Sequence, residues 1–213
     1  MKRLIVVGAG GHARSVVDIA LQIGEYEIVG CIAPVPGDVL GVPVIGSDDD
    51  LASFFAKGIK YIFVAIGKNH RRYRLYNQAI SMGFEPVNII SRQAVLSPRI
   101  SLGKGICVMA GAVVNVNTSI GDNCIINTCC SIDHDCYIGM SSHIAPGATL
   151  SGTVKIGDGV HIGTGASVID GKSIGDWSYI GSGAAVVKDI RSNVMAYGVP
   201  ARIVRELNQQ KES

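Results

Sequence analysis

A histidine flanked by two carboxylates is the group in this sequence best suited to move a proton. His134 lies between Asp133 and Asp135, and either carboxylate could orient the imidazole and favour the imidazolium that proton transfer forms. A free imidazole has a pKa of ~6.5 and is mostly neutral at pH 7, as a general base must be. Gly152 follows His134 by eighteen residues. The alternatives are a general base and a surface histidine on a polar turn.

Two further histidines, His143 and His161, are eighteen residues apart, and Tyr179 follows eighteen residues later. A stacked pair of histidines could ligate a metal, as in γ-type carbonic anhydrases, but a zinc site needs a third ligand. We favour the alternative, a ladder of polar side chains on a flat face, and expect no metal. His143, nine residues after His134, remains a candidate site residue.

A glycine-rich turn, Gly8-Ala9-Gly10-Gly11-His12, stands between an apolar strand and a helix. Backbone N–H groups at such a turn point at an incoming phosphate. The full dinucleotide fingerprint is absent, because Ala13 or Arg14 stands where its last glycine is expected. The turn is therefore either a packing feature or a cradle for a phosphate or a nucleotide sugar, and His12 favours binding.

The elements that must position these residues follow a six-residue repeat. From Leu96 to Val186, every sixth residue is Leu, Ile or Val. The sixteen positions are Leu96, Leu102, Val108, Val114, Ile120, Ile126, Ile132, Ile138, Ile144, Leu150, Ile156, Ile162, Val168, Ile174, Ile180 and Val186. This period predicts a β-helix, in which each hexapeptide forms a short strand and a turn and directs its aliphatic side chain into the axis.

Glycines repeat with a period three times as long. They follow the aliphatic position at Gly103, Gly121, Gly139, Gly157 and Gly175. Three hexapeptides therefore form one coil of a triangular prism, and the whole repeat gives about five coils, roughly 25 Å tall. We expect this corner to need a backbone conformation that residues with a Cβ adopt only at a cost.

The first 90 residues lack this repeat and alternate between apolar strands and amphipathic helices. Strands are expected at 4–7, 27–32, 42–45, 61–66 and 86–90, and helices at 16–23, 51–56 and 71–82. A run of three aspartates at 48–50 could cap the second of these helices. The alternation predicts an α/β unit with a small parallel sheet, one half of a Rossmann-like fold.

These patterns divide the chain into three expected parts. Residues 1–90 form the small α/β domain and residues 91–192 the β-helix domain. Residues 193–213 form a C-terminal tail that departs from the repeat, and a short helix is expected within it at 204–211.

The composition excludes several classes of function. Apolar residues make up 47% and charged residues 17%, which supports a buried core and argues against disorder. The net charge of +2 gives no basic stripe for nucleic acid. The apolar run at 4–7 is too short for a signal peptide, and the uncharged stretches carry too many polar residues for a membrane span. Six cysteines without a CxxC pair indicate a reduced, cytoplasmic protein.

Short motifs along nearly the whole chain resemble those of one known family. They are Val7-Gly8-Ala9-Gly10-Gly11-His12, Ala65-Ile66-Gly67 with Arg72, Asn127-Thr128, His134-Asp135-Cys136, His143 with Pro146-Gly147-Ala148, and Gly198-Val199-Pro200-Ala201. The chain resembles the bacterial sugar O- and N-acetyltransferases of the left-handed β-helix class. Within that class it is similar to the group that contains nucleotide-amino-sugar N-acetyltransferases and sialic acid O-acetyltransferases.

The resemblance implies a homotrimer with active sites between neighbouring subunits, and acetyl transfer from acetyl-CoA without a covalent enzyme intermediate. By position, His134 corresponds to the general base and Asp135 to the carboxylate that polarises it. His143 corresponds to a residue beside the thioester, and Gly152 to a backbone N–H near the acetyl oxygen.

The same resemblance implies two binding regions. The CoA arm is expected along the segment that contains Gly181 and Gly183. The nucleotide-sugar pocket is expected in the N-terminal domain at Gly10, Gly11, His12, Gly67 and Arg72.

One position departs from the family pattern. Members that use UDP-sugars have an acidic residue just after the second strand, where this chain has Ile32-Ala33-Pro34. The departure leaves another nucleotide, or sialic acid, as the acceptor, whereas the His-Asp-Cys segment favours the amino-sugar branch. We therefore expect an acetyl-CoA-dependent N-acetyltransferase acting on the 4-amino group of a nucleotide-linked sugar. The alternatives are a sialic acid O-acetyltransferase and, in another class, a non-catalytic β-helix that serves binding or assembly.

Overall fold

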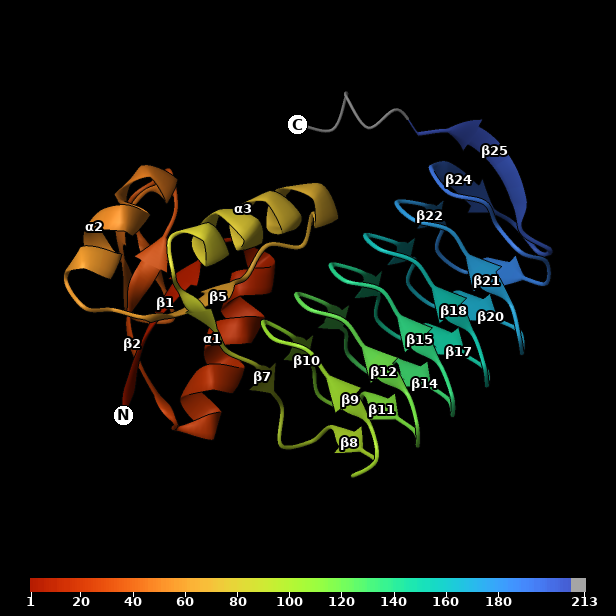
Figure 1. The fold of residues 1–213 in the computed structure, drawn as a ribbon, viewed down its shortest axis with the longest axis horizontal. Helices are drawn as coiled ribbons and strands as arrows, with labels where there is room; N and C mark the ends of the chain where they lie inside the picture. The colour runs from red at the N-terminus through yellow and green to blue at the C-terminus, as the bar shows by residue number, and fades with distance from the viewer. Residues whose placement is uncertain (208–213) are drawn as a thin grey trace. The chain divides into compact units, whose positions relative to one another are not determined.

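The structure, a computed structural model, describes residues 1–207 and divides into two compact units, Met1–Ser91 and the chain from Arg92 onward (Figure 1). The first unit contains an α/β sheet and the second a stack of short-stranded coils. The fold class predicted from the sequence, a small parallel sheet followed by a β-helix, is confirmed.

The first unit is built on a sheet with the strand order β3-β4-β2-β1-β5-β6. Its strands are β1 (Lys2–Val7), β2 (Tyr26–Ile32), β3 (Asp38–Val39), β4 (Val42–Gly46), β5 (Tyr61–Val64) and β6 (Glu85–Pro86). Neighbours are parallel except β3 and β4, which pair antiparallel. Strand β3 was not predicted, because two residues carry no alternating pattern. The strand expected at 86–90 is divided between β6 and β7 (Ile89–Ile90).

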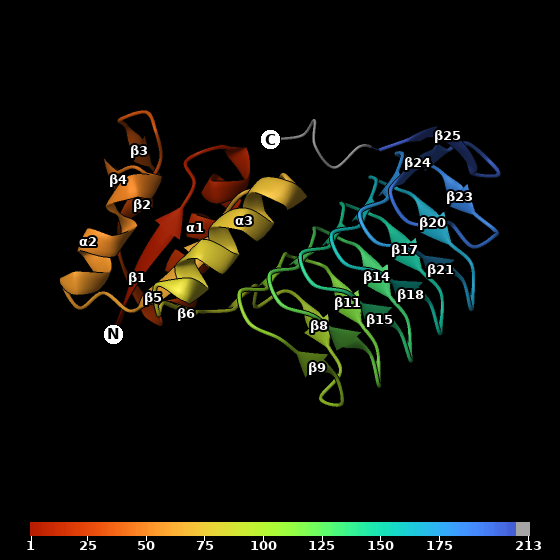
Figure 2. The ribbon, with the colours of Figure 1, turned by 45° about the horizontal axis from the view of Figure 1, so that its top comes forward.

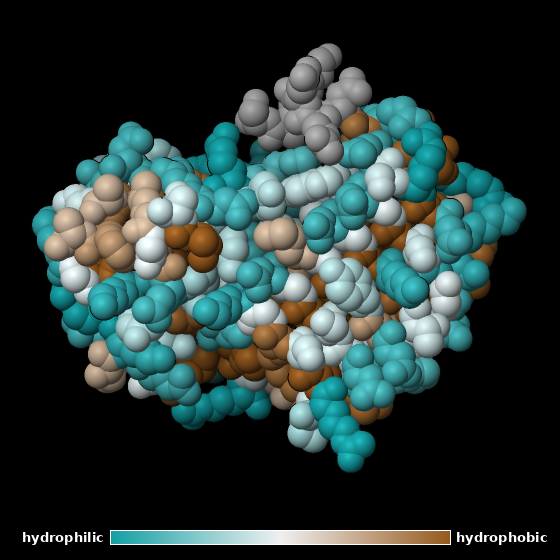
Figure 3. Space-filling view, in the orientation of Figure 1, coloured by the Kyte–Doolittle hydropathy of each residue, from teal (hydrophilic) through white to brown (hydrophobic). Residues whose placement is uncertain are grey.

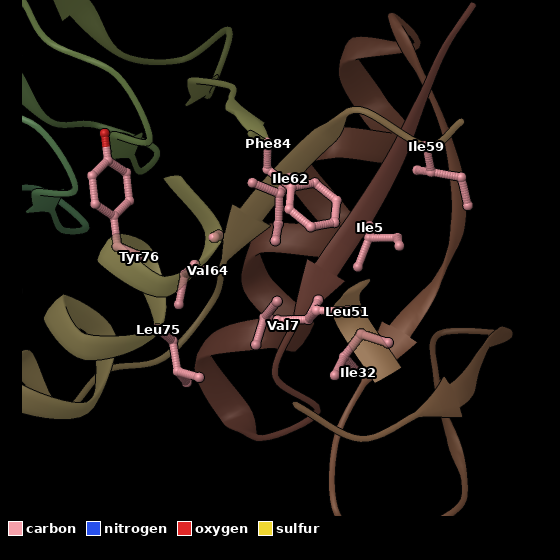
Figure 4. Close-up of a cluster of buried hydrophobic side chains, with 11 residues drawn as sticks. Ile5, Val7, Ile32, Leu51, Ile59, Ile62, Val64, Leu75, Tyr76 and Phe84 are labelled. Carbon is pink, nitrogen blue, oxygen red and sulfur yellow. The ribbon is translucent and has the colours of Figure 1, made fainter. Parts of the chain in front are cut away.

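Three helices cover this sheet: α1 (Gly11–Ile23), α2 (Leu51–Ala56) and α3 (Asn69–Ser81). Leu51 of α2 and Leu75 of α3 join Ile5 and Val7 of β1 in the core shown in Figure 4. Successive residues of a strand face opposite sides of the sheet, so Val6, between Ile5 and Val7, faces the other side. Helix α1 also packs against β1.

The last residue of the aspartate run, Asp50, stands at the N-cap position of α2 as expected, but its side chain bonds elsewhere. The Asp50 carboxylate accepts the backbone N–H of Ser47 at 2.8 Å, one turn earlier, and stabilises a short 3-10 helix, η1 (Asp48–Asp50). No side-chain hydrogen bond caps α2 itself.

The second unit is a prism of two-residue strands (Figure 2). The strands are β8 (Val95–Leu96), β9 (Ser101–Leu102), β10 (Cys107–Val108), β11 (Val113–Val114), β12 (Ser119–Ile120), β13 (Ile125–Ile126), β14 (Ser131–Ile132), β15 (Tyr137–Ile138), β16 (His143–Ile144), β17 (Thr149–Leu150), β18 (Lys155–Ile156), β19 (His161–Ile162), β20 (Ser167–Val168), β21 (Ser173–Ile174), β22 (Tyr179–Ile180) and β23 (Ala185–Val186). Each strand ends in the aliphatic residue of the repeat, and these residues are buried from Val108 onward.

Every third strand belongs to the same wall of the prism. Ile120 of β12 pairs with Ile138 of β15, and Ile126 of β13 pairs with Ile144 of β16. All such neighbours run parallel in a register of eighteen residues. The coil length inferred from the glycine period is therefore confirmed.

The five corner glycines are required because there is no room for a side chain. The expectation that they adopt an unusual backbone conformation is wrong. None of the five has a positive φ angle. A Cβ on Gly121 would lie 2.8 Å from the backbone N of Met140, and one on Gly139 would lie 2.5 Å from the carbonyl carbon of Gly157. Consecutive coils approach each other too closely at this corner for any side chain.

The left-handed backbone conformation occurs at other turn positions. One such column contains Asn117, Asp135, Thr153 and Gly171, with φ angles of 61°, 57°, 59° and 67°. Asn and Asp adopt this conformation more readily than other residues with a Cβ, because their short polar side chains bond locally. The conformation places Asp135 beside the ring that it orients.

Residues 194–206 extend the prism. Strand β24 (Val194–Tyr197) pairs in parallel with β22, and β25 (Arg202–Glu206) folds back antiparallel on β24. The side chains of Arg191 and Glu206 form an ion pair at this end. The expected helix is wrong for residues 204–206, which lie in β25, and residues 208–211 lie outside the described residues.

None of the helices in the described part of the chain combines the length and the apolar character that a bilayer crossing requires.

Candidate active site

The His134 side chain is held at the turn that follows β14. Asp133 Oδ1 accepts the backbone N–H of His134 at 2.9 Å and closes the turn. Asp135 Oδ2 accepts a hydrogen bond from Nδ1 of the His134 ring at 2.8 Å. Asp135 therefore orients the ring, which resolves the choice between the two aspartates that the sequence left open.

Two asparagines of the preceding coil fix these carboxylates. The amide of Asn115 donates to Asp133 Oδ1 at 2.9 Å, and the amide of Asn117 donates to Asp135 Oδ1 at 3.1 Å. Neither asparagine was singled out from the sequence. The available signal was the coil period, since each asparagine precedes its aspartate by eighteen residues.

Protonation of His134 is favoured by its neighbours. The hydrogen bond to Asp135 raises the pKa of His134 above its ordinary value, and the charges of Asp133, Asp135 and Asp170 act in the same direction. Since Asp135 occupies Nδ1, the proton of a neutral ring lies on Nδ1 and the lone pair lies on Nε2. About half of the side chain is exposed, at 51%. The residue can accept a proton at Nε2 from a bound molecule.

Gly152 lies directly above the His134 ring. A Cβ at this position would lie 2.5 Å from Cε1 and 2.6 Å from Nε2 of that ring. The column of His134 and Gly152 recognised in the sequence therefore brings the two residues into contact. The space beside the glycine is filled by the imidazole itself.

The second candidate histidine, His143, lies on β16 and is buried. Its Nε2 lies 2.9 Å from the amide nitrogen of Asn127. Asn127 Oδ1 accepts the backbone N–H of Thr128 at 2.8 Å, which orients the amide so that its nitrogen faces the ring. His143 Nε2 must then accept, so the neutral ring carries its proton on Nδ1. Asn127 was part of a quoted motif but was not predicted as a site residue.

His143, His161 and Tyr179 form the expected ladder on one wall. The His143 and His161 rings meet edge to face with centroids 4.8 Å apart, and the His161 and Tyr179 rings stack at 4.4 Å. Across residues 1–207, no group of three or more His, Cys, Asp or Glu side chains is arranged to hold a metal ion.

The two glycines expected along the CoA arm lie in the turn between β22 and β23. A Cβ on Gly181 would lie 2.7 Å from the Cβ of Tyr197, so packing alone requires a glycine there. Gly183 has a φ angle of 67° and open space around it. Its backbone is therefore accessible on the side where a Cβ would stand.

The glycine-rich turn of the first unit begins α1. Gly8 has a φ angle of 124°, and a Cβ there would lie 2.6 Å from the carbonyl oxygen of Ala65. Gly10, Gly11 and Gly67 have no neighbour within 4 Å of an added Cβ, so packing does not explain them. Gly10 caps α1 without a side-chain hydrogen bond.

His12 stands at the start of α1 and is uncharged at neutral pH. Burial, followed by the charge of Arg72, lowers the pKa of His12 to about 4. Its Nε2 is buried without a hydrogen-bond partner among the described residues. An unsatisfied polar atom in such a place costs free energy, which a ligand that bonds to it would recover.

Arg72 is buried, with 1% of its surface exposed. Its guanidinium donates to the carbonyl oxygens of Ile66 and Gly67 at 3.0 and 3.1 Å and to Asn69 Oδ1 at 2.9 Å. These bonds hold the loop between β5 and α3. Arg72 was expected to bind substrate, and the structure shows in addition that it stabilises this loop.

Replacing Arg72 by leucine is expected to lower the free energy of unfolding by about 3 kcal/mol, because two carbonyl groups lose a charged donor. Arg71→Leu is the matched control. Arg71 is 43% exposed on its side chain and lies 3.4 Å from Asp48, so less than about 1 kcal/mol is expected from it. Urea denaturation of both variants measures the difference. Equal losses would contradict the structural role of Arg72.

Comparison with known proteins matches both units. Residues 3–79 match the PglD N-terminal domain, and residues 117–152 match the bacterial transferase hexapeptide (six repeats). A GDP-perosamine N-acetyltransferase from Escherichia coli O157:H7 is 31% identical over 158 residues, which are 71% of this chain and 71% of that protein.

Two solved structures are similar over almost their full length. PerB from Caulobacter crescentus, in complex with CoA and GDP-perosamine, is 41% identical with a TM-score of 0.92, covering 95% of this chain and 97% of that one. The acetyltransferase domain of PglB from Neisseria gonorrhoeae FA1090 is 36% identical with a TM-score of 0.92, covering 96% of this chain and all of that one, at 100%.

Proposed function

The chain belongs to the family of left-handed β-helix sugar acetyltransferases, and from this we propose that it transfers acetyl from acetyl-CoA to the 4-amino group of a nucleotide-linked sugar. The observation that carries the proposal is the His134 ring, anchored at Nδ1 by Asp135 with Nε2 turned to the other side. A general base in this form can take a proton from the acceptor amine as it attacks.

The reaction is a direct transfer within a complex of both substrates. The amine nitrogen forms a bond to the thioester carbonyl carbon, the carbon–sulfur bond breaks, and the CoA thiolate leaves. His134 Nε2 takes the proton that the nitrogen loses and can pass it to the thiolate. Within residues 1–207 the Gly152 amide N–H donates no hydrogen bond, which suits it to stabilise the oxyanion, a contribution of up to ~3 kcal/mol.

His143 is assigned to acetyl-CoA. Asn127 leaves the neutral ring with its proton on Nδ1, so the ring is a donor there and suits a carbonyl oxygen of the co-substrate. We assign the CoA arm to the turn that contains Gly181 and Gly183. Gly183 supports this assignment because no side chain blocks its backbone.

The N-terminal unit is assigned to the nucleotide. Gly10, Gly11 and Gly67 leave open space where a side chain would stand, and His12 has a buried Nε2 without a partner among the described residues. Both observations support contact with a polar ligand. We favour a guanosine nucleotide, because the enzymes similar to this chain include two that are named for GDP-perosamine or were solved with it. The lack of an acidic residue after β2, at Ile32-Ala33-Pro34, argues in the same direction.

The functional assembly is proposed to be a homotrimer. Exposed apolar side chains along the coils include Tyr137 at 52% and Ile169 at 44%, and brown and white residues run among teal ones over the coils in Figure 3. A second prism would cover such residues. All six cysteines are free thiols, which supports a cytoplasmic location.

Asp135→Asn is expected to lower kcat about tenfold and to shift the acid limb of the pH profile to lower pH. The sign follows from the pKa of His134, which Asp135 raises. The base form is lost as pH falls through that pKa, so removing the carboxylate moves the loss to lower pH. Steady-state rates across pH measure both effects.

The control for this change is Asp122→Asn, since Asp122 Oδ1 accepts the backbone N–H of Lys104 on another corner. Its profile is expected to match the wild type. An acid limb that stays in place in Asp135→Asn would show that Asp135 does not act on the catalytic base.

A panel assay tests the proposed function as a whole. Acetyl-CoA consumption, measured as free thiol, is followed with GDP-, UDP- and dTDP-linked 4-amino sugars, sialic acid and its CMP form. We expect turnover with a nucleotide 4-amino sugar, the GDP-linked one first. Turnover with a sialic acid alone would place the protein in the O-acetyl branch, and no turnover and no CoA binding would overturn the enzymatic function.

A further inference from the structure

Asp170 completes a column with the proposed base. It follows β20, eighteen residues after Gly152 and thirty-six after His134, so the three residues stand one above another on successive coils. Because Gly152 has no side chain, the side chains of His134 and Asp170 both approach the place where its Cβ would stand. A Cβ on Gly152 would lie 2.6 Å from His134 Nε2 and 3.1 Å from Asp170 Oδ1.

The Asp170 carboxylate is fixed where it stands. Thr153 Oγ1 donates to Asp170 Oδ1 at 3.1 Å, and the next residue, Gly171, donates its backbone N–H to the Gly152 carbonyl at 3.0 Å. Asp135 therefore bonds Nδ1 of the imidazole, and Asp170 Oδ1 lies beside the point that the Cε1–Nε2 edge of the same ring faces. The Nε2 side is where the acceptor must bind.

The charges that act on His134 come from few residues. Among the described residues they are Asp133 and Asp135 on its own turn and Asp170 from another coil. The preceding coil presents Asn115, Val116 and Asn117, which carry no charge. The nearby Cys136 thiol is held neutral, because burial and the same carboxylates raise its pKa.

We propose that Asp170 is a specificity-determining residue that selects an amine over a hydroxyl as the acetyl acceptor. This inference rests on the proposed function. An amine acceptor carries positive charge as the free ammonium ion and again, at its nitrogen, in the adduct with the thioester before His134 takes the proton. The carboxylate stabilises the positive charge at each stage. A hydroxyl acceptor instead develops negative charge on its oxygen, which Asp170 disfavours.

The test compares Asp170→Asn with the wild type. An asparagine oxygen can still accept the Thr153 hydroxyl, so the turn is preserved. We expect KM for the 4-amino sugar nucleotide to rise about tenfold, as for loss of an opposite charge within ~4–6 Å. The inhibition constant of the 4-hydroxy counterpart is expected to stay unchanged, and the acid limb of kcat/KM is expected to move to lower pH.

The matched control is Asp176→Asn. Asp176 lies in the turn between β21 and β22, at another corner of the prism, where its Oδ1 accepts the backbone N–H of Asp158 at 2.8 Å. This variant is expected to keep the wild-type values. A variant Asp170→Asn with unchanged KM and unchanged pH profile would overturn the role of Asp170 and leave the proposed function standing. Wild-type protein that acetylates no amino sugar would overturn both.

Discussion

Replacing His134 by asparagine is expected to lower kcat by about 10²–10⁴-fold, the range that a positioned general base contributes. An amide cannot take the proton that the acceptor nitrogen loses at Nε2, so the adduct returns to substrates. The side chain is half exposed and closes no core, so the thermal midpoint and the affinity for CoA are expected to stay as in the wild type.

His70→Asn is the matched control for this change, since His70 lies on α3 in the other unit. Its kcat is expected to equal that of the wild type. Rates are measured with both substrates saturating, so that weakened binding is not mistaken for slow chemistry. A near-normal kcat in His134→Asn would show that His134 is not the general base.

Gly152→Ala is expected to lower kcat about a hundredfold, the cost of displacing a catalytic group by about 1 Å. The added methyl would lie 2.5 Å from Cε1 and 2.6 Å from Nε2 of His134, closer than non-bonded atoms can approach, so the ring must turn away and lose its alignment with Asp135. Gly152 has no positive φ angle, so the backbone accepts alanine without strain. Activity and the thermal midpoint are measured together.

Gly165→Ala provides the opposite control. Gly165 has a φ angle of 65° and no neighbour within 4 Å of an added Cβ, so alanine there strains the backbone and touches no site residue. We expect about 1 kcal/mol of lost stability with kcat retained. If Gly152→Ala loses stability in proportion to its activity, the effect is on folding and not on the ring.

The sequence was sufficient for the β-helix because one aliphatic residue in six must face the axis. That constraint leaves an unbroken pattern from Leu96 to Val186, and the parallel register of the strands follows from it. The β24–β25 hairpin carried no such signal, since β25 is exposed along its whole length and pairs antiparallel. A strand with no buried face has no alternation of apolar and polar residues, so it could not be predicted from the sequence.

The coil period was enough to predict which residues of the candidate site stand above one another, but not which side chains bond to each other. The period of eighteen residues brought His134 and Gly152 together correctly. It could not decide between Asp133 and Asp135, because that choice depends on the left-handed φ angle at Asp135. Asp170 was also not predicted, although it follows His134 by thirty-six residues, which is twice the coil period.

Arg72 shows a second limit. A sequence motif associates an arginine with a binding loop but does not show whether the guanidinium faces a ligand or the loop itself. Here at least three of its hydrogen bonds go to residues 66–69. The bonds of a buried cation are a property of packing, which a motif does not record.

The most direct test of the account is the chemical identity of the product. The purified protein is incubated with acetyl-CoA and a GDP-linked 4-amino sugar, and the product is characterised by NMR and mass spectrometry alongside the thiol released. Direct transfer to the amine predicts an amide at the sugar nitrogen, one thiol for each amide, and no acetyl group retained on the protein. An ester on a sugar hydroxyl, or acetyl bound covalently to the protein, would contradict direct transfer to an amine.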